Sequence, residues 1–363
     1  MFDNGATQLD TAAAQETVLA TRQTLVNVEQ QVLFAAVQAY VNVLTQQDVV
    51  ALRQNNLRLL QEELRAANDR FEVGEVTRTD VALAQSQVAE ARANLTDARG
   101  ALLSARATYE EVVGHAPGRV SAYPPLPRRA SSLDAAQALA LRSHPRLRAQ
   151  QHAVKAAELK ADSALRDMGP SLNLSANASH GEFHDTAIDS DDFSVSLNLS
   201  QTLYAGGGLA AARRAELARL DAERGNLLSV QRSITSNAAS AYTGFDTAAA
   251  SLVSSNQRVR AAQVAFEGVR EEATLGSRTT LDVLQAEQEL LDAQTARLSA
   301  RATQALAAYD LLQAQGLLTA ENLNLAVERY DPEIYHNQVR NAPAFVTKRG
   351  QDLDRVLKAL RKN

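Results

Sequence analysis

The chain has 363 residues, of which 45% are hydrophobic but only 4% aromatic, and it contains neither Trp nor Cys. Because aromatic side chains usually supply much of a core's buried area, their shortage argues against two ordinary globular cores. The absence of Cys excludes a disulfide framework and a Cys-ligated zinc site. The formal net charge is −5. No cluster of Lys and Arg exceeds what a solvated helix face carries, so nucleic acid is not an expected partner.

Residues 5–72 predict one very long helix, because they contain a single Gly and no Pro. Apolar residues recur every seven positions in two series, and the shift of four residues between the series is typical of a coiled-coil stutter. Such a helix would be on the order of 100 Å long, so we expect it to pack along a partner of equal length. The two series are Val18, Leu25, Val32 and Ala39, then Val43, Val50, Leu57 and Leu64.

A return helix is predicted after a turn at Gly74–Asp80 and ends at Gly114. A row of Ala residues with a seven-residue period runs along it, which is typical of a narrow seam for knobs-into-holes packing. The alternative explanation is the plain helix propensity of Ala. A second row far downstream favours the seam. The rows are Ala84, Ala91, Ala98 and Ala105, and Ala286, Ala293, Ala300 and Ala307.

A Pro-rich extended linker follows from residue 117 and marks a boundary between two halves of the chain. The sequence Ser131–Asp134 predicts the start of a short helix that ends near Ser143. Pro145 then opens another helix, which we expect to run to about Met168.

Residues 169–204 change to a period of two and predict a β-hairpin. Apolar residues alternate with Asn and Ser over 172–178 and again over 193–199. Strands of this kind fit an outer-membrane β-barrel that faces lipid on one side and water on the other. A hairpin lying on a soluble core is the alternative, but no other strands are predicted that would complete a soluble sheet. Three glycines, Gly206, Gly207 and Gly208, are expected to bend the chain from strand into helix.

The chain contains an internal duplication, because matching residues recur at a constant offset of 276 − 74 = 202 positions. Gly74 and Gly276 mark the two matching turns, and residues 209–273 and 279–316 repeat the long helix and its return helix. The matched pairs at the turns are Gly74 with Gly276, Thr77 with Thr279, Asp80 with Asp282, and Val81 with Val283. The predicted parts are the first helical hairpin (1–116), linker and short helices (117–168), β-hairpin (169–204), second helical hairpin (205–318) and C-terminal tail (319–363).

Together these features resemble the TolC family of outer-membrane efflux ducts. The resemblance is carried by Arg70–Gly74 with Thr79–Val81 in the first copy, and by Gly276–Thr279 with Leu281–Leu284 in the second. The passage Leu203–Gly207 adds to it. It implies a mostly α protein: two tandem antiparallel coiled-coil hairpins form the protomer of a helical tunnel, and a β-hairpin contributes to a shared outer-membrane barrel.

The resemblance also implies function and partners. Family members are homotrimers in contact with outer-membrane lipid. They work as passive export conduits for drugs, or for proteins in type I secretion, with a periplasmic adaptor (a membrane fusion protein) and an inner-membrane RND or ABC pump. We expect the same location here, outer membrane and periplasm. A periplasmic adaptor is an alternative, but an adaptor would carry a lipoyl-like β-domain around one hairpin. A coiled-coil scaffold without channel activity would not need the β-hairpin.

One departure concerns the start of the chain. Family members begin with a signal peptide, short helices and a first β-hairpin, whereas Phe2–Gly5 matches the end of the second hairpin. The sequence is therefore interpreted as an N-terminally truncated member. With half of the usual strands, we expect that it cannot close a membrane barrel.

The resemblance implies a gate where the helical tips converge at the periplasmic entrance. The second-tip Arg278 would link to Asp80, with its neighbour Thr79, on the first tip. Asp282 would belong to a ring of acids at the constriction.

This gate departs from the family pattern at two positions. The second ring acid falls at Gln285 and a tyrosine used in closure falls at Ala273, so part of the usual closing contacts is missing. The alternative is that Asp80 and Asp282 only cap the helices that begin there, since Asp is favoured at helix starts. Both roles can coexist.

No catalytic motif or cofactor-binding motif is evident, and no enzyme activity is expected. His180 and His184 lie four residues apart near several Asp residues, which would suit a metal. They lie in the loop of the hairpin, where a hydrated surface is the favoured explanation, and we predict no metal site.

Overall fold

The computed structural model describes residues 2–120, 122–182 and 189–327, and in addition Ile334, Lys348, Asp352 and Arg355. The chain divides into two compact units, Met1–Thr319 and Ala320–Asn363. In the second unit, residues 321–324 form a turn, and Arg355 pairs with Asp352 at 3.0 Å. All the helices and strands named below lie in the first unit.

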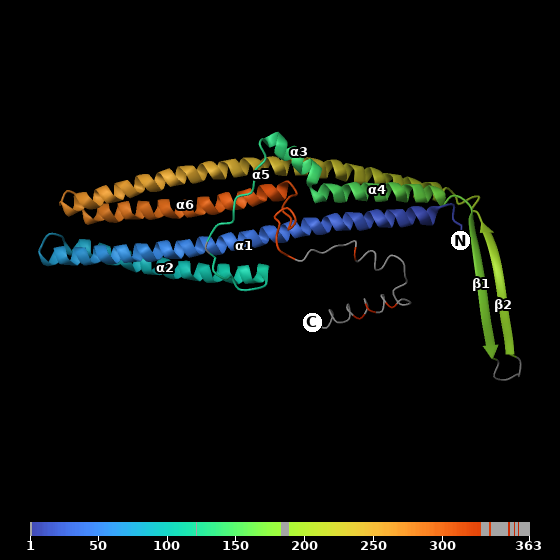
Figure 1. Cartoon of the computed structure of the whole chain (residues 1–363), viewed down its shortest axis with the longest axis horizontal. Helices are drawn as coiled ribbons and strands as arrows, with labels where there is room; N and C mark the ends of the chain where they lie inside the picture. Colours follow the sequence, from blue (N-terminus) through green and yellow to red (C-terminus); the bar gives the residue numbers. More distant parts are fainter. Residues whose placement is uncertain are drawn as a thin grey trace. The chain divides into compact units, whose positions relative to one another are not determined.

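Two long helical hairpins make up most of the first unit (Figure 1). The first hairpin consists of α1 (Ala6–Glu72) and α2 (Arg78–Val113), and the second of α5 (Gly208–Thr274) and α6 (Thr280–Ala314). The long helices α1 and α5 have 67 residues each, as the duplication predicts. Contacts between α1 and α6 hold the two hairpins side by side. The predicted hairpins are thus confirmed.

Small residues form the seams inside the hairpins. All four Ala residues of the first row are buried, and the Ala residues of the second row are buried or half-buried. Small side chains let two helix backbones approach closely, so large neighbours such as Val81, Val88 and Leu95 can fill the remaining space. The seam interpretation of the Ala rows is therefore confirmed.

The first three residues of the first apolar series of α1 are not part of such a seam within one chain, although the fourth, Ala39, is buried. Val18, Leu25 and Val32 are each about half exposed, at 49%, 48% and 54%. In this half of α1 the partner is the shorter helix α4 (Pro145–Arg166), which covers another face that includes Ala6 and Ala13. The predicted seven-residue spacing of apolar residues is present along α1, but the spacing alone does not show which face of α1 is covered by α4.

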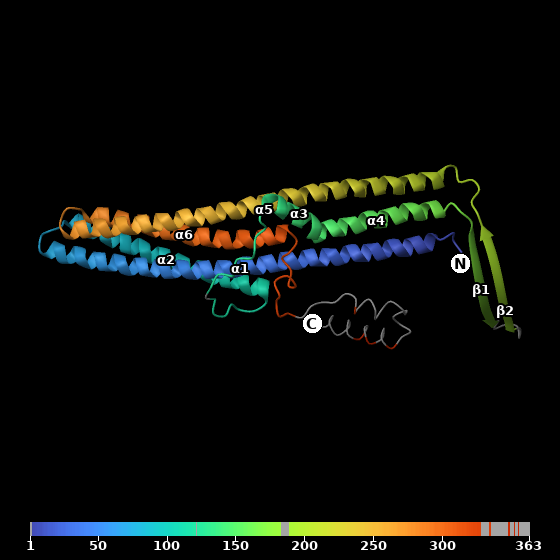
Figure 2. The ribbon, with the colours of Figure 1, turned by 45° about the horizontal axis from the view of Figure 1, so that its top comes forward.

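The short helices α3 (Leu133–Ser143) and α4 lie where the sequence predicts them, although α4 ends two residues before Met168. Ser132 caps α3, because its hydroxyl accepts a hydrogen bond from the Ala135 N–H at 3.1 Å. In Figures 1 and 2, α4 runs along both α1 and α5. Beyond the ends of α2 and α6, α4 packs between α1 and α5 and links them.

The β-hairpin pairs β1 (Ser171–Glu182) with β2 (Asp189–Ser200) in antiparallel register. Apolar residues face apolar residues across the ladder, as at Leu174 with Leu197, and the face they share is exposed. Phe2 forms an antiparallel bridge to Leu172 on the other edge of β1. The exposed apolar residues are Leu174, Phe193, Val195, Leu197 and Leu199. Within the described ranges, no helix has both the length and the apolar character needed to cross a membrane.

The bend from strand to helix uses two glycines rather than three. Gly206 and Gly207 have φ of 57° and 86°, in the left-handed region that other residues avoid. Gly208 is instead the first residue of α5, so its predicted place in the bend is wrong. Gly5, which matches Gly207 in the first copy, has φ of 87° before α1.

Candidate functional site

The candidate site is the pair of helical tips that join α1 to α2 and α5 to α6. At both tips a Gly ends the long helix in the left-handed region, with φ of 82° at Gly74 and 78° at Gly276. The Glu75 N–H then donates to the Arg70 carbonyl at 2.8 Å, and the Ser277 N–H donates to the Glu272 carbonyl at 3.0 Å. These bonds satisfy helix-end carbonyls in the Schellman arrangement. The left-handed backbone at the two predicted turns therefore explains why Gly occupies both positions.

The return helices begin with matching capping boxes. Asp80 Oδ2 accepts from the Thr77 N–H at 2.8 Å, and Asp282 Oδ2 accepts from the Thr279 N–H at 2.9 Å. In the reverse direction, the Asp80 N–H donates to the Thr77 hydroxyl at 3.3 Å, and Asp282 does the same to Thr279 at 3.2 Å. The helix-cap interpretation of both Asp residues is therefore confirmed.

The caps also set the charge at the tips. The hydrogen bond from the Thr77 side chain, followed by that from its backbone, holds the pKa of Asp80 below its usual value. Backbone and side-chain hydrogen bonds from Thr279 lower the pKa of Asp282 in the same way. Hydrogen bonds to the ionised form favour it. Each tip therefore carries an ionised carboxylate, and one of its oxygens, Oδ2, is held by the Thr of its own turn.

The sequence interpretation named Thr79 but did not recognise the capping role of Thr77. Thr79 is exposed in the first turn of α2. The spacing Thr-x-x-Asp at Thr77 and again at Thr279 was the signal for this role, because Thr followed three residues later by an acid is typical of a helix start.

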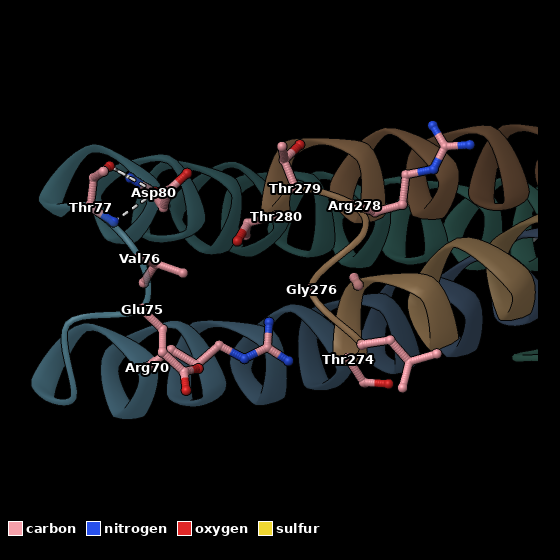
Figure 3. Close-up of a pocket in the computed structure, with 12 residues that line it drawn as sticks. Arg70, Glu75, Val76, Thr77, Asp80, Thr274, Gly276, Arg278, Thr279 and Thr280 are labelled. Carbon is pink, nitrogen blue, oxygen red and sulfur yellow. Dashed lines mark hydrogen bonds between the residues drawn. The ribbon is translucent and has the colours of Figure 1, made fainter.

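Arg278 pairs within its own tip. Its Nε donates to Glu272 Oε2 at 2.8 Å, and this hydrogen bond raises the pKa of the guanidinium. In Figure 3 the Arg278 side chain points away from Asp80, which is bonded to Thr77. Within one chain, the structure therefore pairs Arg278 with Glu272 rather than with Asp80.

A cleft of about 530 Å³ separates the two tips (Figure 3). It is lined by backbone and side chains of both turns, so it exists only because the hairpins lie side by side. Its rim is strongly polar and carries both signs of charge. The charged and hydroxyl residues that line it include Arg70, Glu75, Thr77, Asp80, Arg278 and Thr279.

Two other predicted positions are placed by the structure. Ala273 is buried in an apolar cluster with Phe266 and Val283, and Gln285 is exposed on α6. His184 and the side chain of His180 lie outside the described residues, so the absence of a metal there stays a prediction. Among the residues that the structure describes, no group of three His, Asp or Glu side chains could hold a metal ion.

Comparison with known proteins identifies the family. The outer membrane efflux protein family matches residues 1–115 and 137–320. The chain belongs to this family. It is a family of transport channels rather than a class of enzymes, and its proteins are channel components of efflux and secretion systems at the outer membrane. Membership decides against the adaptor and scaffold alternatives.

Individual relatives agree with this assignment. The outer membrane efflux protein BepC of Brucella suis is 36% identical over 346 residues, which cover 94% of this chain and 75% of BepC. The alkaline protease secretion protein AprF of Pseudomonas aeruginosa is 27% identical and covers 73% of this chain, which spans 57% of AprF. The outer membrane channel CmeC of Campylobacter jejuni shares the fold, with a TM-score of 0.76 at 14% identity over 91% of this chain and 73% of CmeC. The predicted TolC-like fold is confirmed.

Proposed function

We propose that this protein is the passive duct of a tripartite efflux or type I secretion system, with its helical tips as the gated entrance on the periplasmic side. The observation that carries the proposal is the juxtaposition of two duplicated, charged tips at one end of paired hairpins. The names of BepC and AprF, an efflux protein and a protease secretion protein, support both kinds of cargo. The cleft between the tips is a suitable place for a periplasmic adaptor to dock, with an RND or ABC pump beyond it.

The exposed apolar residues support a homotrimer in the outer membrane. Val18, Leu25 and Val32 form an uncovered row along α1, and a large exposed apolar surface on one chain usually marks an interface. Neighbouring protomers would cover this row. The apolar face of the β-hairpin, with Leu197 and Leu199 exposed, would contact lipid.

The proposed gate consists of Thr79, Asp80, Arg278 and Asp282. Arg278 is half exposed, and its pair with Glu272 lies at the surface. An exposed ion pair contributes little, so the guanidinium can exchange Glu272 for a carboxylate of a neighbouring protomer. Three symmetry-related copies would multiply the effect of each such contact on the entrance.

The gate is tested by single-channel conductance of the full-length protein in planar bilayers. We expect Asp80→Ala and Arg278→Ala each to increase the conductance of the resting channel, because each removes one partner of a closing contact. Thr77→Ala is the matched control, since it weakens the same cap and keeps the Asp80 carboxylate. Equal increases in Asp80→Ala and Thr77→Ala would assign the effect to the cap alone. Unchanged conductance in both Asp80→Ala and Arg278→Ala would contradict the gate.

A further inference from the structure

The contact between the two hairpins contains a buried acid. Glu287 on α6 is only 3% exposed, and its Oε1 accepts a hydrogen bond from the Asn56 Nδ2 on α1 at 2.8 Å. The other oxygen, Oε2, is buried without a hydrogen-bond partner. This polar contact therefore joins one hairpin to the other at a point where water is excluded.

The surroundings of Glu287 are largely apolar. Leu284, one turn away on α6, packs with Leu60 of α1 and Val88 of α2. Leu290, also one turn away, belongs to the cluster around Phe266. An ionised carboxylate in such a place has a high desolvation cost. Burial accordingly raises the pKa of Glu287 to about 7.

Two charged residues act on Glu287 from neighbouring helices. Glu63 on α1 disfavours its ionisation, and Arg270 on α5 favours it. These two residues pair with each other at 3.4 Å, so their effects on Glu287 oppose one another. Asn56 and Glu63 are seven residues apart, which places them on the same face of α1. The two polar contacts between the hairpins, Asn56 with Glu287 and Glu63 with Arg270, therefore start from the same face of α1.

The duplication provides an internal reference for this acid. The residue that matches Glu287 in the first copy, 202 positions earlier, is Gln85, which is exposed on α2. In the second copy, the acid Glu287 is buried between the hairpins. In the first copy, the neutral Gln85 lies in solvent, where a charge would have no desolvation cost.

We propose that Glu287, buried beside Asn56 at the contact between the two hairpins, is a protonation-dependent latch. Neutral Glu287 stays packed there and holds the tips together, whereas ionised Glu287 is driven toward water and loosens them. The inference rests on the proposed function, because the tips that the latch controls are the proposed entrance. It adds a regulatory input, proton concentration, and a residue outside the proposed gate.

The direction follows from the raised pKa. The neutral form of Glu287 is favoured in the packed arrangement, and the ordinary pKa of the group is 4.5. The stabilising contribution is therefore fully present below about pH 4.5 and is lost as the pH rises through about 7. Above that value, the hairpins separate more easily at the tips.

The latch is tested by distance measurements on the full-length trimer. The chain has no Cys, so spin labels attach only to introduced cysteines. The two substitutions are Val73→Cys and Leu275→Cys, at exposed positions of the two tips. Labelled protomers are diluted with unlabelled protein so that distances within one chain are measured by pulsed electron resonance. Spectra are recorded from about two units below to about two units above pH 7.

We expect the tip-to-tip distance to lengthen or broaden with a midpoint near pH 7. Glu287→Gln keeps a neutral side chain and should hold the short distance throughout. Asn56→Ala removes the hydrogen bond that favours the ionised form, and should move the midpoint upward by on the order of one pH unit. A purely structural role of Asn56 would not move the midpoint. Gln85→Glu is the matched control and should leave the curve unchanged.

Three outcomes would overturn the latch: pH-independent distances in the parent protein, an unshifted midpoint in Asn56→Ala, or the same transition in Glu287→Gln. If Glu287→Gln does not fold, the Asn56→Ala midpoint decides alone. Conductance is measured on the same samples. A conducting channel with pH-independent tips refutes only the latch, whereas pH-dependent tips in a protein that does not conduct refute the proposed function.

Discussion

The two tips have the same backbone but different charged surroundings. Both end a 67-residue helix at a left-handed Gly and start the return helix with a Thr–Asp capping box. Only the second tip carries the Arg278–Glu272 pair, because Val76 and Arg70 stand at the matching positions of the first. The comparison shows that both copies kept what closes the turn. They diverged in the side chains that are free to meet another surface.

The ends of the two return helices differ more strongly, and the largest predicted effect lies there. Gly114 and Gly316 both have positive φ, but an added Cβ would meet open space at Gly114 and the backbone of His144 at 2.5 Å at Gly316. We expect Gly114→Ala to cost about 1–2 kcal/mol for the left-handed backbone. Gly316→Ala should cost about 1–3 kcal/mol more, because the packing there must shift.

Urea unfolding of both glycine variants measures this difference. The Gly114 variant is the matched control, because it has the same backbone strain without the clash. Equal losses of stability in the two variants would mean that α6 does not end against the start of α4, and the asymmetry between the copies would disappear.

A smaller and equal effect is predicted at the two capping boxes. Thr77→Ala and Thr279→Ala each remove an N-cap, which typically costs about 1 kcal/mol. Hydrogen exchange of the amides at each tip should accelerate roughly fivefold, and by the same factor at both. A clearly larger effect at one tip would show that its cap has a second role in the folded chain.

The caps and the latch should respond to acid in opposite directions. Asp80 and Asp282 have lowered pKa values, so their contribution is present above the usual value of 3.8 and is lost as the pH falls through the lowered values. The stabilising contribution of the Glu287 contact instead increases as the pH falls. Amide hydrogen exchange at the tips should therefore change below about pH 4, whereas the distance between the tips should change near pH 7.

The smallest predicted effect is that of Arg278→Ala on stability. The guanidinium and Glu272 are both about half exposed, and exposed pairs contribute little because water and salt screen them. We expect the midpoint of urea unfolding to stay unchanged, while conductance changes as proposed for the gate. A marked loss of stability would show that the residue acts inside its own tip.

Local features of the fold were predictable from the sequence. The heptads, the glycines at the tips and the alternation over 172–178 and 193–199 each reflect interactions between residues close together in the chain. The sequence pattern is therefore enough to predict the structure at these places. The end of α3 at Ser143 followed for the same reason, whereas both strands reach four residues further toward the turn than the alternation indicated. Even where a detail was wrong, as at Gly208, the error was one residue within the correct turn.

The tertiary structure alone decided which faces are covered and which charges meet. Asn56 and Glu287 are 231 residues apart in the chain, and no heptad shows that this acid faces the other hairpin while Gln85 faces solvent. The same holds for Val18, whose period was visible but whose exposure depends on where α4 lies. A helix pattern records the spacing of side chains along one element. Burial, and with it the protonation of Glu287, depends on what the neighbouring elements bring against that face.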